Sequence, residues 1–472
     1  MKVAIIGSGP GGMITAKMLT EAGIDVTLFE KGKQISQRAV DPFSVTEMDT
    51  KYTDKGVTVA LGNPKVSYVE GSCLGGGSEV NAGLYHRTPE PVFDTWSRES
   101  RVNYAYQELL SHMEVCEKLV NVCKLPFDPP AASLKLVEGA KKLNWHYMEV
   151  PRWYKYETSS DQGIHSGVRQ SMTEAVLPTL ELERLTILTE TEVLGISSEN
   201  SAKVDIYYRD KQSTKEQKSF DYVFLACGAI STPYLLQKSG FKNKHIGRSL
   251  RLHSTVKVIA RFPEPVNGRN PGVPVHQVKE FSPGFSIGGS ISSLPFVAAG
   301  LFNKPYTYRE IREMVPFLST YYAMISDGVG SVKKSPLIDR PIVRFHIPSS
   351  GIKRLNHAVR RLTELMFAAG AEEVFPSLNN LVSLKSQEQW KEYPECIPAK
   401  DFNLMTIHLM GSCPMGKDET SSVVNQDGLL HGESRIFLSD ASIIPSALGV
   451  NPQGTIMALA RRNASEFLKR VK

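Results

Sequence analysis

The stretch Val3-Ala-Ile-Ile-Gly-Ser-Gly-Pro-Gly-Gly12 decides the fold of this chain, because a short apolar run leads directly into three spaced glycines. A second apolar run, Asp25-Val-Thr-Leu-Phe-Glu30, follows and ends in an acid. The spacing predicts a strand, a tight turn, a helix and a second strand. This is the arrangement in which a parallel sheet begins in many nucleotide-binding proteins.

Each glycine of the turn has its own expected role. Gly7 allows the tight turn, Gly9 lets the backbone approach a pyrophosphate, and Gly12 lets the helix pack closely against the strand. The amide groups at the helix N-terminus would then hold phosphate, and Glu30 would accept from a ribose hydroxyl. A plain glycine-rich turn would leave Glu30 unexplained, so we predict dinucleotide binding.

Length and composition bound the class of protein. The 472 residues suggest two or three domains, and 41% hydrophobic with 22% charged residues is typical of a globular chain. The net charge of +6 comes from interspersed residues, so we expect neither a nucleic-acid partner nor a membrane span. Because the first strand starts at residue 3, no secretory signal precedes it, and a cytoplasmic location is expected. The six cysteines lack metal-ligand spacing, so we predict reduced, mostly packed thiols and no metal site.

Further along, apolar spacing predicts helices over 103–124 and 166–180 and strands over 186–189 and 203–208. The nearly continuous apolar run over 222–228 indicates a strand buried on both faces of a parallel sheet.

The sequence changes in character between about 254 and 400, where prolines, glycines and short apolar runs predict a β-rich module interrupted by helices, one of them over 351–369. After residue 400 the glycine-rich pattern returns. Ile436-Phe-Leu-Ser-Asp440 has the pattern of a strand that ends in an acid, and the last twenty residues are predicted to be helical. The nucleotide-binding domain is therefore expected to be discontinuous in sequence.

Near the C-terminus stand His408-Leu-Met-Gly-Ser-Cys-Pro-Met-Gly416 and, later, Asn451 followed by Pro452. Asn451 suits a helix N-cap and Pro452 the first helical position, so a helix is expected to begin there.

The chain resembles the glucose–methanol–choline (GMC) flavin oxidoreductases from its first strand to its last helix. Four stretches are similar: the opening glycines with Glu30; Gly75-Gly-Gly-Ser-Glu-Val-Asn81; Gly228-Ala-Ile-Ser-Thr-Pro-Tyr-Leu-Leu-Gln-Lys-Ser-Gly240; and the pair His408 and Asn451. The third stretch departs from the family pattern after its last glycine, where Phe241 and Lys242 replace an aliphatic residue and a glycine.

The resemblance implies FAD as cofactor and the oxidation of an alcohol to a carbonyl by hydride transfer to flavin N5. It implies that His408 takes the hydroxyl proton, which suits an imidazole that titrates near neutral pH. Asn451 stands where the family has His or Asn, and its amide can orient the substrate oxygen but cannot act as a base. The alternative for His408 is a structural, hydrogen-bonded histidine.

The resemblance also implies the residues that would contact the cofactor. The backbone at Val193 would hold adenine, Asp440 and Ala441 would lie near the pyrophosphate and ribityl chain, and the helix after Asn451 would direct its positive end at the flavin. An ordinary strand valine and a plain helix-capping Asp are the alternatives for Val193 and Asp440. The full set of expected cofactor-binding residues is Gly7, Gly9, Gly12, Glu30, Gly75, Ser78, Asn81, Val193, Asp440, Ala441, Pro452 and Thr455.

Other residues receive weaker assignments. Members with a covalent histidyl link have that histidine just after the glycine–serine turn, where this chain has Glu79, so noncovalent FAD is predicted. His86 is expected to be a hydrogen-bonding or substrate-side histidine, Cys73 a packed thiol, and His253 a structural residue.

Taken together, the predicted fold class is α/β (α+β overall). It consists of a Rossmann-like FAD-binding domain with a parallel sheet and a substrate domain with an antiparallel sheet and helices. The expected boundaries are 1–95, 160–253 and 401–472 for the FAD-binding domain, and 96–159 and 254–400 for the substrate-binding domain.

The expected substrate is a small-molecule alcohol, and the electron acceptor is O2 or another acceptor. Aromatic residues in the second domain would suit a sugar, glycoside or polyol, and equally an aromatic or lipid alcohol; they are Phe281, Phe285, Tyr321, Tyr322 and Trp390. Two other classes stay open: a flavin-containing lyase that uses His408 as acid and base without redox turnover, and a binding protein that retained the fold without catalysis.

Overall fold

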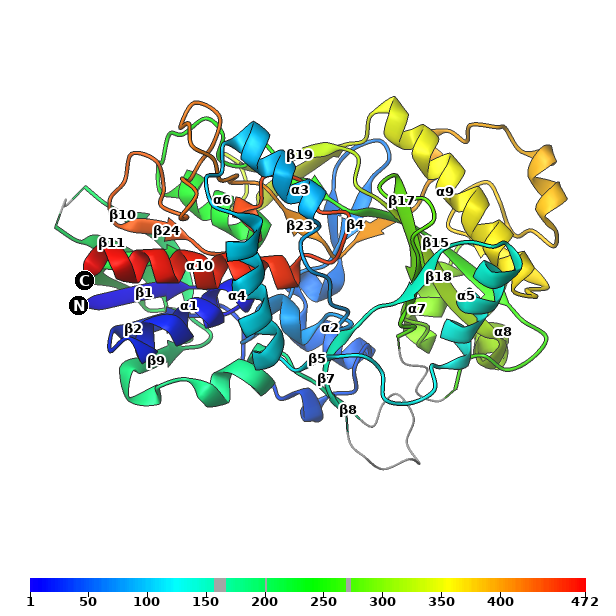
Figure 1. The fold of residues 1–472 in the computed structure, drawn as a ribbon, viewed down its shortest axis with the longest axis horizontal. Helices are drawn as coiled ribbons and strands as arrows, with labels where there is room; N and C mark the ends of the chain where they lie inside the picture. The colour runs from blue at the N-terminus through cyan, green and yellow to red at the C-terminus, as the bar shows by residue number, and fades with distance from the viewer. Residues whose placement is uncertain (157–166, 200–201, 269–272) are drawn as a thin grey trace.

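The computed structural model describes residues 1–156, 167–199, 202–268 and 273–472. A parallel sheet lies at one end of the molecule and a larger, mostly antiparallel sheet at the other (Figure 1). Both chain termini lie at the end with the parallel sheet. Within the described residues, no helix combines the length and the apolar composition that a membrane-spanning segment needs.

The parallel sheet is built from segments that are distant in sequence. Its strands are, in spatial order, β24 (Ile436–Leu438), β13 (Tyr222–Leu225), β1 (Lys2–Ile6), β2 (Asp25–Phe29) and β9 (Leu185–Leu188). Helix α1 (Pro10–Glu21) connects β1 to its parallel neighbour β2, as the opening glycines predicted. The Rossmann-like arrangement and its discontinuity in sequence are thereby confirmed.

The C-terminal helix α10 (Gln453–Val471) completes the core of this end of the molecule. It packs against α1, and its Phe467 ring lies 5.1 Å from the ring of Phe224 on β13 and 5.3 Å from that of Phe437 on β24. Phe467 is almost fully buried. The packing of the last helix therefore depends on β13, more than 200 residues earlier in the chain, and on β24, about 30 residues earlier.

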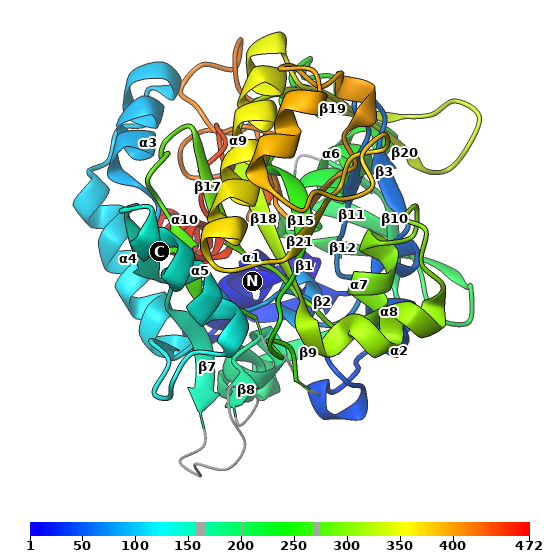
Figure 2. The same ribbon diagram turned by 90° about the vertical axis from the view of Figure 1, so that its right-hand side faces the viewer.

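The larger sheet supplies the second half of the molecule. Its strands are, in order, β3 (Thr58–Ala60), β4 (Val66–Tyr68), β22 (Leu404–Thr406), β15 (Ser254–Arg261), β18 (Leu318–Ile325), β17 (Phe285–Gly289), β16 (His276–Val278) and β6 (Tyr147–Glu149), with β21 (Glu373–Pro376) also paired to β15. Helices α5 (Ala131–Lys142) and α9 (Ser349–Ala368) pack against it (Figure 2). Tyr321 on β18 donates a hydrogen bond to the carbonyl of Ala132 on α5. The predicted β-rich module with helices is confirmed.

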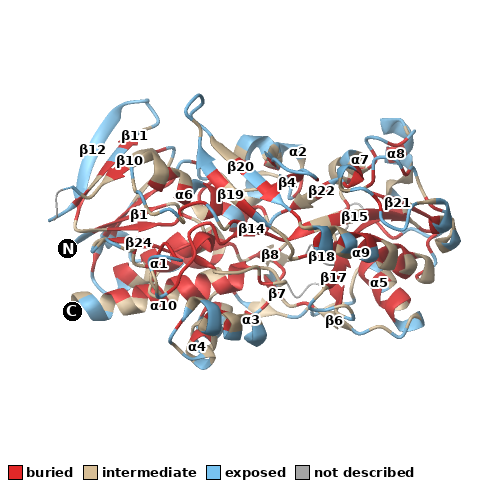
Figure 3. Cartoon of the chain, turned by 90° about the horizontal axis from the view of Figure 1, so that it is seen from above, coloured by how far each residue is buried: buried red, intermediate tan, exposed pale blue. Residues whose placement is uncertain are grey.

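Smaller elements surround these two sheets. The outermost is an antiparallel sheet of β10 (Glu192–Ser197), β11 (Val204–Arg209) and β12 (Lys215–Phe220), whose β12 is largely exposed (Figure 3). The others are α2 (Val45–Lys51), α3 (Glu90–Thr95), α4 (Tyr106–Leu119), β5 (Val122–Cys123), β7 (Arg152–Tyr156), β8 (Gly167–Arg169), α6 (Gly228–Lys238), β14 (Arg251–Leu252), α7 (Leu294–Gly300), α8 (Tyr308–Met314), β19 (Val329–Lys334), β20 (Pro341–His346) and β23 (Leu409–Met410).

Two expectations about local structure were wrong. The predicted helix over 166–180 is, in its described part, strand β8 followed by short helical turns at Met172–Val176 and Leu177–Thr179, because residues 167–169 pair with β7. Asn451 does not cap α10, since the helix begins at Gln453 and Pro452 occupies the N-cap position. The predicted domain boundaries stay a prediction.

Replacing Phe467 with Ala should lower the free energy of unfolding by about 3–5 kcal/mol, because it empties a buried aromatic site between α10 and the parallel sheet. Denaturant unfolding followed by circular dichroism measures the change. Lys469→Ala, on the exposed side of the same helix, is the control and should stay within about 0.5 kcal/mol of the parent. Equal stability of both variants would show that α10 does not contribute to the core.

Candidate functional site

The opening turn has the geometry that a bound phosphate requires. Gly7 has a φ of +100°, and a Cβ there would lie 2.3 Å from the carbonyl oxygen of Ala226. A Cβ on Gly12 would lie 2.0 Å from the carbonyl oxygen of Gly7, whereas the space beside Gly9 is open. The open side of Gly9, at the N-cap of α1, is therefore where a phosphate can approach backbone amides.

Glu30 is held at the end of β2 by three hydrogen bonds. Its Oε2 accepts from the amide of Ser8 (3.1 Å) and from Ser8 Oγ (2.5 Å), and its Oε1 accepts from the amide of Gly32 (2.7 Å). Burial raises the pKa of this carboxyl, and the three donors act in the opposite direction. Glu30 is thus fixed beside the turn, as expected for a residue that meets a ribose.

The loop Gly75–Asn81 lies directly against the opening turn. The amide of Gly75 donates to Ser8 Oγ (3.0 Å), and a Cβ on Gly76 would come within 2.9 Å of Gly9 Cα. At the other end of the loop, Asn81 Nδ2 donates to Oε1 of Gln453, the first residue of α10 (2.6 Å). The loop therefore bridges the predicted phosphate end and the start of the C-terminal helix.

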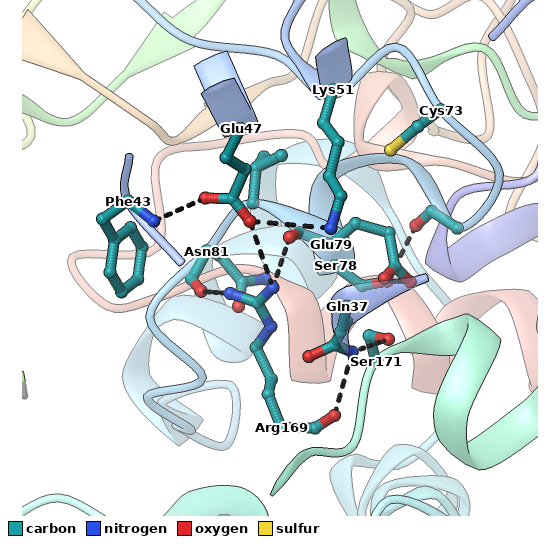
Figure 4. Close-up of polar contacts among 12 residues, drawn as sticks. Gln37, Phe43, Glu47, Lys51, Cys73, Ser78, Glu79, Asn81, Arg169 and Ser171 are labelled. Atoms are coloured by element: carbon teal, nitrogen blue, oxygen red, sulfur yellow. Dashed lines mark hydrogen bonds and ion pairs between the residues drawn. The ribbon is translucent and has the colours of Figure 1, made fainter. Parts of the chain in front are cut away.

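A buried cluster of charged side chains lies at this loop: Glu79 belongs to the loop itself, and Glu47, Lys51 and Arg169 come from other segments (Figure 4). All four are at most 4% exposed. The guanidinium of Arg169 donates to the backbone carbonyls of Glu79 and Asn81, and lies 3.9 Å from Glu47 Oε1. Two positive and two negative groups balance one another, which is the condition under which charges can be buried.

Asp440 occupies the opposite side of the predicted phosphate site. Its carboxylate accepts from the amide of Gly228 (2.9 Å), from Thr232 Oγ1 (2.5 Å) and from the amide of Ser442 (2.8 Å). The last bond caps the short turn Ala441–Ile443, so the capping interpretation of Asp440 also holds. Glu70 lies beside Asp440, and burial first and this neighbouring charge second raise its pKa to about 8.

His408 comes two residues after the end of β22 and stands between two polar side chains. Its Nδ1 lies 3.0 Å from His253 Nδ1, and its Nε2 lies 3.2 Å from Asn451 Nδ2. Burial lowers the pKa of His408 to about 4, so the ring is uncharged at neutral pH. The structure therefore brings together the two residues that were predicted to be catalytic, although 43 residues separate them in sequence.

His86 belongs to the same site, where Asn451 and Gln277 are its polar neighbours. Within the described part of the chain, neither of its ring nitrogens has a partner at hydrogen-bonding geometry, although the side chain is buried. Burial, with a smaller contribution from the charge of Lys279, lowers the pKa of His86 to about 3. Gln277 Nε2 on β16 donates to the hydroxyl of Tyr322 on β18 (2.9 Å), and strand β17 lies between these two strands in the larger sheet. These groups give the site a polar wall.

The remaining residues that were predicted to contact the cofactor lie on α10, on β10 and after β24. Thr455 lies in the first turn of α10, and its Oγ1 is 2.8 Å from Thr88 Oγ1. Pro452 directly precedes that helix. Val193 lies on β10, close to the segment that pairs with Glu30. The amide of Gly411, three residues after His408, donates to the carbonyl of Ala441 (3.0 Å). This bond joins the segment of His408, which was predicted to be catalytic, to the segment that was predicted to lie near the pyrophosphate.

Sequence reasoning missed several residues of the site. Ser8 stands between two of the quoted glycines, and its position there is a signal that could have been used. Arg169, Glu70, Gln453 and Lys279 have no recognisable motif, because their partners come from distant parts of the chain.

Comparison with protein families identifies the class. A model for the N-terminal part of GMC oxidoreductases matches residues 30–255, one for the C-terminal part matches 327–460, and an FAD-binding domain model matches 1–40. The chain is thus an FAD-binding oxidoreductase. It belongs to the GMC oxidoreductase family.

Relatives support this assignment along the whole chain. An uncharacterised GMC-type oxidoreductase of Sinorhizobium fredii is 34% identical and covers 98% of this chain and 94% of the relative. A long-chain-alcohol oxidase of Arabidopsis thaliana is 27% identical over 99% of this chain and 69% of its own length. The crystal structure of pyridoxine 4-oxidase from Mesorbium loti superposes with a TM-score of 0.75 at 18% identity, covering 99% of both chains.

The residues present fit FAD as the cofactor. The open side of Gly9 at the start of α1 suits a phosphate, and Glu30 lies at the strand end where a ribose hydroxyl would be met. The loop Gly75–Asn81 continues from there to the start of α10 and His408, so a long, two-part cofactor has polar groups along its length.

Replacing Arg169 with Met should weaken FAD retention by roughly tenfold or more, because two loop carbonyls lose their buried donor and Glu47 loses a neighbouring positive charge. Fluorescence titration of the FAD-depleted protein measures the dissociation constant. Arg38→Met, at an exposed position nearby, is the control. Unchanged FAD affinity in the Arg169 variant would show that the charge cluster does not support the loop.

Glu70→Gln should raise the unfolding temperature more at pH 8.5 than at pH 5. Because the folded-state pKa is raised to about 8, the parent protein loses stability as pH rises from about 4.5 to about 8, and Gln has no charge to bury. Differential scanning calorimetry across this pH range should show a difference of several degrees at the upper end (about 2–4 °C per kcal/mol). A pH-independent difference would rule out a buried, titrating Glu70.

Proposed function

We propose that this chain oxidises the CH–OH group of a small polar alcohol, such as a sugar, glycoside or polyol, to a carbonyl. The observation that supports this most is the uncharged, buried imidazole of His408 beside Asn451. Asn451 directly precedes the start of α10, and this end of α10 contacts the loop Gly75–Asn81. An alcohol oxidation needs a proton acceptor and an oxygen-binding group at one place. Relatives whose names denote alcohol oxidation, including an alcohol dehydrogenase (acceptor) of Pseudomonas putida that is 22% identical, agree with this reaction class.

The roles of the side chains follow from their chemistry. Bound FAD supplies the acceptor for the hydride of the CH–OH carbon. His408 takes the hydroxyl proton at Nε2, the ring nitrogen on the side of Asn451, and the Asn451 amide orients the oxygen. Since burial lowers the pKa of His408 to about 4, this base is uncharged throughout the neutral range.

The polarity of the site supports a hydroxylated substrate. His86 offers two unpartnered ring nitrogens, and Gln277 has an unpartnered side-chain oxygen within the described residues. A buried polar group without a partner has a free-energy cost that a substrate hydroxyl can remove. A purely apolar chain, by contrast, would leave these groups unsatisfied.

Noncovalent binding of FAD is part of the proposal. Glu79, which stands where covalently linked relatives have histidine, is buried, and its Oε1 accepts from Ser78 Oγ and from the amide of Thr173 (3.2 Å each). A carboxylate engaged in this way supplies no link of the histidyl type. Acid precipitation should therefore release all the flavin into the supernatant.

Anaerobic mixing of the FAD-loaded protein with a panel of alcohols should bleach the flavin absorbance with sugars, glycosides or polyols. His408→Ala should keep its FAD and slow flavin reduction by roughly 10²–10⁴-fold, because no group remains to take the proton. His357→Ala, an exposed histidine on α9, is the control. Readmitting air then separates an oxidase, which regains its colour, from a dehydrogenase.

Failure of every alcohol to bleach the flavin would overturn the oxidation. Turnover of a substrate without bleaching would favour the lyase. Normal flavin reduction by the His408 variant would remove this residue from its role as base.

A further inference from the structure

His253 stands directly behind His408 and contacts the nitrogen that faces away from Asn451. The two Nδ1 atoms are 3.0 Å apart, and the rings are nearly perpendicular, at 87°. His253 is fully buried, and its Nε2 accepts a hydrogen bond from the amide of Gly449 (3.0 Å). The site therefore contains a chain of contacts that runs from Gly449 through both histidines to Asn451.

Both imidazoles are uncharged at neutral pH. Burial lowers the pKa of His408 to about 4 and that of His253 well below its usual value. An uncharged imidazole has one ring proton, so one nitrogen of each ring donates and the other accepts. The two nitrogens that carry these protons can be assigned from their neighbours.

The backbone amide of Gly449 decides the assignment, because it can only donate. His253 Nε2 must therefore accept, and the ring proton of His253 lies on Nδ1. That proton points at His408 Nδ1, which must accept in turn. The ring proton of His408 then lies on Nε2, and the amide of Asn451 turns its oxygen toward it.

The form of His408 that can act as a base is the other tautomer. A proton can be taken up at Nε2 only when the ring proton is on Nδ1, and then His253 must accept at its own Nδ1. His253 would have its proton on Nε2, facing the N–H of Gly449 at 3.0 Å, so a hydrogen bond is replaced by two opposed donors. The base form is therefore the minor one, at roughly one part in ten to one part in a hundred.

We propose that His253, held by the amide of Gly449, is a positioning residue that determines which nitrogen of His408 bears the proton. In the resting site His408 presents an N–H at Nε2, which suits hydrogen bonding to a substrate oxygen. It becomes a base only in the fraction of molecules in which the Gly449–His253 hydrogen bond is given up. The consequence for catalysis rests on the proposed function; the tautomer itself does not.

Two further titratable groups, His86 and Lys279, lie near this part of the site. Burial is the main cause of the low pKa of both His86 and His253, and the charge of Lys279 lowers both values further. A positive charge at Lys279 opposes protonation of either histidine. The uncharged state of His253 is therefore favoured by Lys279 as well as by burial.

The tautomer can be measured without any substrate. In the FAD-loaded, histidine-¹⁵N-labelled chain, long-range ¹H–¹⁵N spectra at pH 7 should show His408 with a protonated Nε2 and an unprotonated Nδ1. The signals of His408 are identified by their loss in His408→Gln. A protonated Nδ1 on His408 in the unmodified protein would overturn the proposal.

A second test is His253→Asn, which introduces a side-chain oxygen that can accept from His408 Nδ1. This change should move the His408 proton toward Nδ1 and raise its pKa, because the charged ring then has an acceptor there. The acidic limb of the pH profile of anaerobic flavin reduction should move upward by about one unit, a tenfold change in proton affinity. At pH 7, reduction should be faster by roughly tenfold, since the base form is no longer the minor one.

His276→Asn is the matched control, because His276 is also a buried histidine, with its Nδ1 2.8 Å from Ser133 Oγ on α5. It should leave the pH profile and the His408 signals unchanged. A His253→Asn variant with the parent's pH profile and tautomer would overturn the proposal. If that variant does not fold, the ¹H–¹⁵N spectra of the unmodified chain still show which nitrogen of His408 bears the proton. Absence of flavin bleaching by any alcohol, together with a protonated Nε2, would reject the proposed function and retain the assignment of His253.

Discussion

A single hydroxyl, Ser8 Oγ, joins the three segments on which the cofactor site depends. It donates to Glu30 at the end of β2 and accepts from the amide of Gly75 at the start of the glycine loop. Because Ser8 belongs to the turn before α1, the helix N-terminus, the acid and the loop are held in one arrangement. An anion-binding helix end is useful only when neighbouring backbone can approach it, and the bare Cα atoms of Gly9 and Gly76 permit that approach.

Burial determines the chemistry of this molecule as much as residue type does. Beside the loop Gly75–Asn81, opposite charges compensate one another, and Arg169 donates from its two terminal nitrogens to backbone carbonyls of the loop. The hydrogen-bonding partners of His408 are uncharged side chains, and burial therefore keeps the imidazoles uncharged. The first arrangement ties Arg169 to the backbone of the loop Gly75–Asn81, and the second leaves an uncharged imidazole beside Asn451, which is the base of the proposed function.

The two sheets position different parts of the site. The parallel sheet gathers the turn, Glu30 and Asp440 at its carboxyl edge, which is where ligands bind in open α/β sheets. The larger sheet contributes Gln277 and Tyr322, and its strand β22 leads toward His408. Residues from both ends of the sequence thus form the site of this GMC oxidoreductase. Helix α10, at the C-terminal end, packs against α1, at the N-terminal end.

The sequence by itself determined the Rossmann-like start, the family, FAD and the pair His408 and Asn451, because each depends on local spacing or on a short motif. It could not determine how residues 166–180 fold, since pairing of residues 167–169 with β7 overrides their helical periodicity. Nor could it reveal Arg169, Glu70 or the contact of His253 with His408, which depend on burial and on partners far away in the chain. The proton positions on the two histidines depend on the tertiary structure alone. Every residue except proline has a backbone N–H, so the sequence does not indicate that the amide of Gly449 is the one that donates to His253.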